Sequence, residues 1–182
     1  MGAWYGFSAL FMQYLESGCG MKYADAAHYI LIVPFISLTV VCINIWLSVY
    51  YDTVSIALLV CSFACSLFLW ISGLYVDKGI GMAIFGILVI SISGGFINVA
   101  IDSFLTRMNP GMSSIGTAVS MSVKAISCLI FPLVNGILIG NTATPKSISK
   151  CCMFMAVPCT IGFILIVIFV LYKPKKEESN FF

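Results

Sequence analysis

Hydrophobic positions along this chain form long uninterrupted runs, separated by short polar or turn-prone segments. A helix that crosses a bilayer needs about 20 consecutive, mostly apolar residues. Five of the runs have about that length, and a shorter run precedes them. The pattern therefore predicts a six-helix chain followed by a polar C-terminal tail at residues 173–182. The predicted helices cover residues 3–15, 26–51, 54–76, 79–104, 113–138 and 151–172.

The first run, residues 3–15, is only about half to two-thirds as long as a full membrane span. It ends at Glu16, and the turn-prone residues Ser17 to Gly20 follow directly. We therefore expect a truncated first helix, explained by an incomplete gene model or by a split gene.

Composition supports a membrane location for the whole chain. Hydrophobic residues make up 61% of the sequence and charged residues 9%, whereas about a quarter of the residues of a soluble domain are charged. These values indicate an all-α integral membrane protein with several crossings. The net charge of +2 is too small to indicate nucleic acid as a partner, and Lys173, Lys175 and Lys176 fit a cluster at the membrane edge.

The residues typical of metal sites and of enzyme active sites are sparse. His28 is the only histidine, and no acidic or thiol cluster accompanies it, so we expect no metal site. The eight cysteines contain no CxxC spacing and lie mostly in apolar runs, where a thiol behaves as a small hydrophobic group. With one histidine, no nucleophile and base can be paired. We expect neither a cofactor nor enzymatic activity.

Lys124 is the only charged residue between Arg107 and Lys146. An ammonium group at the centre of a bilayer costs about 3 kcal/mol, so such residues usually face a bundle interior or an aqueous cavity. Polar neighbours recur at spacings of four and three, which places them on the same helix face as Lys124. This polar stripe consists of Ser113, Thr117, Ser120, Lys124 and Ser127.

A second stripe runs along residues 79–104 and just beyond, and Asp102 is its only charged member. It consists of Ser91, Gly95, Asn98, Asp102 and Thr106. In the interpretation that we favour, both stripes line a solute path, because opposite charges suit a zwitterion. Lys124 would hold a carboxylate, Asp102 an ammonium group or a proton, and Asn98, Thr117 and Ser120 would supply neutral hydrogen bonds. In the alternative, Asp102 and Lys124 form a structural ion pair in a membrane assembly subunit that has no cavity.

Glu16 and His28 flank the turn between the first two predicted helices. Charges at helix ends are usually solvated at the membrane interface. The functional alternative is a role in gating or in proton linkage, and we name both residues as candidates for that role.

The character of the predicted helices repeats with a period of three. Residues 54–76 and 151–172 are apolar on every face, which suits contact with lipid. Helices one, two, four and five are short, broken or polar-striped. This order predicts two three-helix units of opposite topology, as in transporters built from inverted repeats.

Short motifs add a resemblance to a known family. Ala26 and Ala27 open the second helix, Tyr51 and Asp52 close it, and further matches lie on the fifth helix. These are Gly116, Thr117, Ala118, Pro132, Asn135 and Gly136. With them, the chain resembles the C-terminal six-helix half of the major facilitator superfamily, and within it the branch of lysosomal dipeptide transporters.

That resemblance implies a secondary transporter that works by alternating access. Its solute would be a small polar molecule, with a dipeptide as the first candidate and a sugar or an organic anion as alternatives. In this family, the first, second, fourth and fifth helices of each half border the cavity. The resemblance also implies a lysosomal or vacuolar membrane and a missing partner, which is the N-terminal six-helix half or an equivalent subunit.

Overall fold

The computed structural model describes residues 2–50, 54–76, 85–86, 88–89, 91–97, 100–101, 111 and 113–171. All regular structure within these ranges is helical, which confirms the predicted all-α class for this part of the chain. The elements are α1 (Gly2–Gln13), the π-helix η1 (Tyr14–Gly18), α2 (Tyr23–Tyr50), α3 (Val54–Leu74), α5 (Ser113–Ile139) and α6 (Pro145–Leu171). Of the predicted helix 79–104, the longest described stretch is residues 91–97, and it is helical.

Within the described residues, three helices are long and apolar enough to cross a membrane: Tyr23–Trp46, Ser114–Ile139 and Pro145–Ile168. Their outward faces carry large apolar side chains, of which Phe35 on α2 and Leu129 on α5 are 71% and 72% exposed. Water would solvate these faces poorly, whereas lipid tails solvate them well. The chain therefore has the features of a multi-pass membrane protein.

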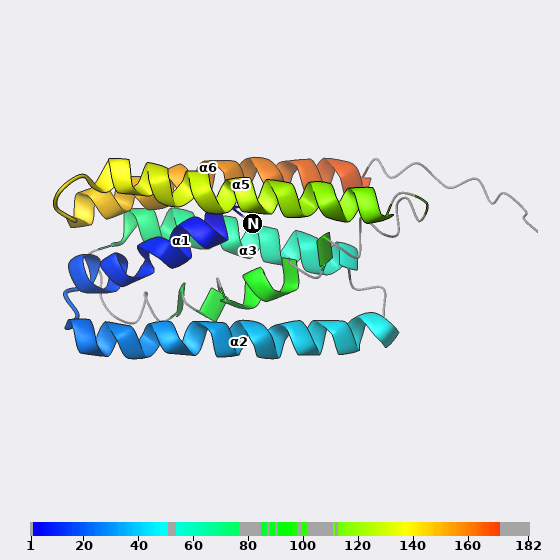
Figure 1. The fold of residues 1–182 in the computed structure, drawn as a ribbon, viewed down its shortest axis with the longest axis horizontal. Coiled ribbons are helices and arrows are strands. Elements are labelled where there is room, and N and C mark those ends of the chain that lie inside the picture. The colour runs from blue at the N-terminus through cyan, green and yellow to red at the C-terminus, as the bar shows by residue number, and fades with distance from the viewer. Residues whose placement is uncertain are drawn as a thin grey trace, which may run out of the picture.

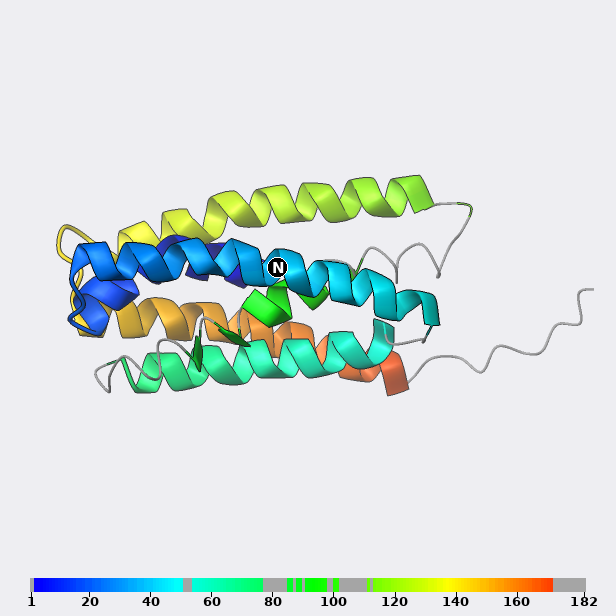
Figure 2. The ribbon, with the colours of Figure 1, turned by 90° about the horizontal axis from the view of Figure 1, so that it is seen from below.

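α1 lies at the centre of the bundle. In Figure 1 it lies between α2 on one side and α5 with α6 on the other, and in Figure 2 it lies between α5 and the pair formed by α3 and α6. The turn after η1 and the turn after α5 lie at the same end of the bundle (Figure 1), which brings Lys22 and Lys146 to that end.

The main core joins α1 to α3 and α6. Phe7 on α1 meets Phe68 on α3 edge to face, with ring centroids 5.6 Å apart. Aromatic pairs favour this geometry. Most of the other fully or nearly buried members come from the same three helices and η1, while Ala26 belongs to α2 and Val76 follows α3: Leu10, Phe11, Tyr14, Leu15, Ala26, Cys65, Leu69, Val76, Ile148, Cys151, Cys152, Met155 and Ala156. The short first helix is therefore an integral part of the packing.

Small and hydroxyl residues connect α3 and α6 closely. Gly73 has no side chain, so Ser149 of α6 approaches near enough for its Oγ to donate a hydrogen bond to the Gly73 carbonyl oxygen. Ser66 and Trp70 lie one turn apart on α3. Their Oγ and Nε1 atoms lie 2.7 and 3.0 Å from Thr160 Oγ1 of α6. Interhelical hydrogen bonds of this kind stabilise helix pairs where water is absent. The outer faces of both helices still carry exposed apolar side chains, as the sequence predicts for contact with lipid.

α6 begins six residues before the predicted start at residue 151, because a capping box precedes the apolar run. The Ser147 backbone N–H donates to Thr144 Oγ1 at 3.2 Å, and the Thr144 N–H donates to Ser147 Oγ at 3.0 Å. Pro145 occupies the first helical position, where its missing N–H costs nothing. The hydropathy pattern did not predict this turn, because the charged Lys146 and Lys150 interrupt the apolar run there.

The first helix also extends past its predicted end at residue 15. It continues as η1 to Gly18, and the Cys19 N–H donates to the Tyr14 carbonyl oxygen at 3.0 Å. The chain then reverses at Gly20, whose φ of +69° is a left-handed conformation that glycine adopts without strain.

Candidate functional site

The polar stripe of α5 lies on the face that is turned toward the bundle. Thr117, Ser120, Lys124 and Ser127 are all partly shielded from solvent. The apolar residues on the remaining faces of the same stretch are exposed: Ile115, Val119, Met121, Val123, Ile126, Leu129 and Ile130. Thr117, Ser120 and Lys124 each take part in a polar or electrostatic interaction. The side chain of Ser113 is outside the part of the structure that is described.

Asn98 and Asp102 lie outside the described residues, and so does any pairing of Asp102 with Lys124. Two other members of that stripe, Ser91 and Gly95, are buried against α2. Ser37 Oγ donates to the Ser91 carbonyl oxygen at 3.2 Å, and a Cβ added at Gly95 would lie 3.0 Å from the Ser37 carbonyl oxygen. These two residues therefore serve close helix packing.

The residues that were named for gating lie at a different level from Lys124. Lys124 is the twelfth of the 27 residues of α5, while Glu16 on η1 and His28 near the start of α2 flank the turn at the far end. The 15 residues from Lys124 to Ile139 span about 22 Å at 1.5 Å per residue. Neither residue lies beside Lys124 in this arrangement, and their role in gating or proton linkage stays a prediction.

His28 lies in an open pocket of about 480 Å³ at this end of the bundle. Its Nδ1 donates to the Ala24 carbonyl oxygen at 2.6 Å, which leaves Nε2 to face the surroundings. The pocket is lined by Met21, Asp25, His28, Tyr29 and Ile32. Asp25 and Tyr29 were not among the residues singled out from the sequence.

Asn135 is a polar residue whose importance sequence reasoning did not recognise beyond the family resemblance. Its side chain is 3% exposed, and its Nδ2 donates to the Gly6 carbonyl oxygen of α1 at 3.0 Å. Asn135 follows Lys124 by eleven residues, or almost exactly three helical turns, so it continues the same inward face. This spacing is the signal that could have identified it.

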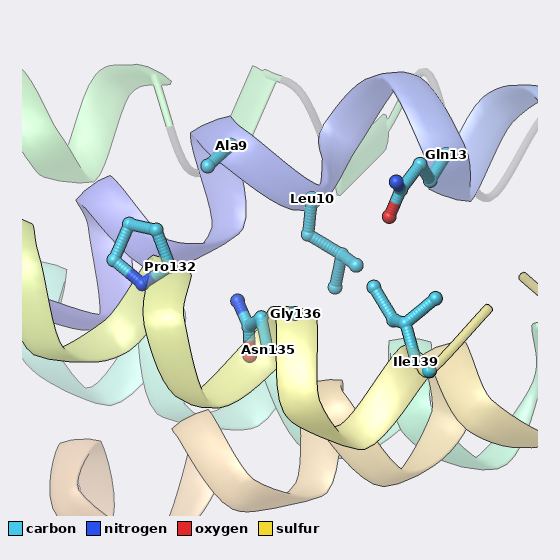
Figure 3. A pocket seen from close by; sticks show the side chains of 8 residues that line it. Ala9, Leu10, Gln13, Pro132, Asn135, Gly136 and Ile139 are labelled. Carbon is cyan, nitrogen blue, oxygen red and sulfur yellow. The ribbon is translucent and has the colours of Figure 1, made fainter.

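A pocket of about 170 Å³ lies between α1 and α5, next to Asn135 (Figure 3). The Gln13 side chain points from α1 toward α5, and the amide nitrogen of Asn135 points toward α1. The remaining lining residues are small or apolar: Ala9, Leu10, Pro132, Gly136, Ile139 and Gly140. Gln13 gives no sequence signal, because a single glutamine near a helix end is common.

A larger cavity of about 530 Å³ between α1, α2 and residue 91 is apolar. Its walls combine aromatic and aliphatic side chains with three serines: Phe7, Ser8, Phe11, Ile30, Leu31, Val33, Pro34, Ser37, Leu38, Val41 and Ser91. These side chains include no titratable group, so the described walls offer no acid–base chemistry.

The cysteines and potential metal ligands of the described residues offer little chemistry. Burial raises the pKa of the Cys19 thiol above its usual value, so the reactive thiolate is scarce at neutral pH. Among the residues that the structure describes, no three histidine, cysteine or acidic side chains gather as metal ligands.

The described part of α5 thus carries one charged group and several hydroxyls on a partly shielded face, and two carboxamides line a pocket about 16 Å further along α5. Such groups bind and orient a polar molecule through hydrogen bonds and charge. No protein-family model, no curated protein and no solved structure matches the chain.

Proposed function

We propose that this chain is one half of a secondary transporter that moves a small polar solute, a dipeptide in our leading hypothesis, across a membrane by alternating access. The supporting observation is the division of α5 into two faces. Lys124 shares a partly shielded face with Thr117 and Ser120, while the remaining faces carry exposed apolar side chains. A charged residue is tolerated in a membrane helix when its face meets a bundle interior or an aqueous cavity.

Each polar group has a distinct role in this proposal. Lys124 binds the carboxylate of the solute, and Thr117 and Ser120, which lie seven and four residues before it, supply neutral hydrogen bonds. Asp102 binds the ammonium group of the solute or a coupled proton, and Asn98 adds a further hydrogen bond. A zwitterion is matched by opposite charges on two helices.

The proposal includes a partner for this chain. Six helices in two inverted three-helix units form half of a major facilitator carrier, whose second half or an equivalent subunit supplies the other cavity wall. The exposed apolar faces of α2 and α5 provide surface for both lipid and that partner. The resemblance to lysosomal dipeptide transporters favours a lysosomal or vacuolar membrane.

Accessibility of the inward face to water tests the proposal. Ser120→Cys places a thiol on that face, and Ser122→Cys places one on the exposed outer face, where the Ser122 Oγ donates to the Ala118 carbonyl oxygen at 2.9 Å. We expect a membrane-impermeant thiol reagent to modify Ser120→Cys at least tenfold faster than Ser122→Cys, because only the former meets a water-filled path. Mass spectrometry of the peptide that carries each introduced cysteine gives the rates and separates them from the native thiols.

The same measurement distinguishes the two classes of function. A transporter predicts rapid modification at position 120 and protection by dipeptide. If both introduced thiols remain unmodified, residues 113–127 lie in a dry contact, and the chain is a structural or assembly subunit.

A further inference from the structure

The pocket between α1 and α5 presents two side-chain amides. Gln13 is exposed and directs its amide toward α5, whereas Asn135 is 3% exposed and directs its Nδ2 toward α1 (Figure 3). The Asn135 Nδ2 is used by the Gly6 carbonyl oxygen at 3.0 Å. The Asn135 Oδ1 is buried and has no hydrogen-bond partner among the described residues. In Figure 3 this oxygen lies on the side of Asn135 away from α1, so the Gln13 amide is the one that faces the open space.

The open space has a specific cause, which is the small size of two lining residues. Ala9 carries only a methyl group, and a Cβ added at Gly136 would meet nothing within 4 Å. The resulting 170 Å³ exceeds the roughly 150 Å³ of a cavity that holds benzene. A molecule of about six to eight heavy atoms therefore fits. The lining extends to Gly140, which is exposed just after α5, so the pocket reaches the end of the bundle.

The chemistry of the lining selects the kind of molecule. The described lining carries no charged side chain, so an ion would lose its hydration without compensation. A pure hydrocarbon would displace water from the Gln13 amide without replacing its hydrogen bonds. A carboxamide has both a donor and an acceptor, and it pairs at two points with another amide. A small neutral molecule that contains an amide group satisfies both conditions.

We propose that this pocket binds the neutral amide group of a small solute and is a binding site separate from Lys124. Asn135 lies eleven residues after Lys124, about 16 Å along α5 at 1.5 Å per residue, which is too far for one dipeptide to contact both. The identification of that amide as a peptide bond in transit rests on the proposed function. Binding in the pocket does not require transport.

Binding of N-acetylglycinamide, a neutral probe with two amide groups, tests this proposal on the full chain in lipid nanodiscs. A saturation-transfer NMR titration gives the affinity. We expect Gln13→Leu to weaken binding at least tenfold, because it keeps the shape of the side chain and removes its amide. Gln13 is exposed, so this variant retains the fold.

Filling the pocket provides a second, independent variant. Gly136→Leu places a side chain in the open space and should abolish binding of the probe. Gly162→Leu is the matched control, because a Cβ at Gly162 on α6 also meets nothing within 4 Å, yet Gly162 does not line the pocket. We expect the control to bind the probe as the unmodified protein does.

The proposal is wrong if the unmodified protein does not bind the probe, or if Gln13→Leu binds it with unchanged affinity. It is also wrong if acetate binds as tightly as the amide, since the pocket would then not select neutral molecules. These outcomes are separable from failure of the carrier hypothesis. If the thiol of Ser120→Cys reacts but the probe does not bind, only the pocket proposal is wrong. If the probe binds but that thiol does not react, only the carrier proposal is wrong.

Discussion

Gly6 sets the distance between α1 and α5. A Cβ added at this position would lie 2.7 Å from Phe131 Cβ and 3.0 Å from Met155 Sδ, which is closer than carbon and sulfur atoms pack. The Gly6 carbonyl oxygen also accepts the hydrogen bond from Asn135. Close approach and hydrogen bonding therefore depend on the same residue.

We expect Gly6→Ala to lower the free energy of unfolding by about 2 kcal/mol, because the methyl group forces α1 and α5 apart. Thermal denaturation of the purified protein in detergent measures the change. Gly162→Ala, where the added Cβ meets nothing, serves as the control and should leave the melting temperature equal or slightly higher. Equal melting temperatures for Gly6→Ala and the unmodified protein would contradict the close packing of α1 on α5.

Some residue-level features follow from sequence and others do not. The spacing of Thr117, Ser120 and Lys124 sufficed to predict one shared face, because helical periodicity is local. The role of Gln13 depends on which helix lies opposite, and hydropathy carries no information on that. Asn135 falls between these cases. Its spacing from Lys124 can be read from the sequence, whereas its hydrogen bond to Gly6 is visible only in the structure.

At the scale of single elements, the start of α6 shows how a few side-chain hydrogen bonds define a helix boundary. Thr144 and Ser147 satisfy backbone and side-chain groups reciprocally, and Pro145 begins the helix with a suitable φ. Hydropathy placed the boundary at residue 151, because it records only the apolar run. The helix begins where the cap is, and the apolar run begins six residues, or about 1.7 turns, later.

Ser147→Ala should destabilise the first turn of α6 by about 1 kcal/mol, since it removes one partner of the capping box. Hydrogen exchange followed by mass spectrometry should show faster exchange for the amides of residues 146–150. Thr142→Ala, at an exposed position in the loop before α6, is the control. Unchanged protection of these amides in Ser147→Ala would show that the cap does not stabilise the helix.

The lengths of the other helices follow from the lengths of the apolar runs, because a bilayer imposes both. α2, α3 and α5 lie within three residues of their predicted ends. The first helix is different, since η1 adds a wide turn after Gln13 that no apolar period encodes. π-helical turns arise from local packing and often occur at functional sites.

At the scale of the whole molecule, the core and the candidate site occupy different helices. α3 and α6 pack on each other and on α1, whereas the Lys124 face belongs to α5, and much of α2 remains exposed. In the carrier hypothesis, this division lets the site change its exposure while the core stays intact. The arrangement of the six helices as inverted repeats was predicted from helix character and remains a prediction.

Transport is a property of the intact carrier, so the test of Lys124 uses this chain together with its partner half. We expect Lys124→Ala to reduce dipeptide uptake at least tenfold, because the solute carboxylate loses its only cationic partner on this face of α5. Ser122→Ala, on the outer face, should leave uptake unchanged. Uptake by Lys124→Ala equal to that of the unmodified carrier would remove Lys124 from the solute path.

The hydrogen bond between Ser66 and Thr160 joins residues that are 94 positions apart. At a synthesis rate of about 5 to 20 residues per second, the ribosome reaches Thr160 roughly 5 to 20 s after it has made Ser66. During that interval, Ser66 and Trp70 of α3 lack their hydrogen-bond partner on α6. α3 can therefore reach its final packing against α6 only after residue 160 has been synthesised, so this helix pair forms late relative to the synthesis of α3.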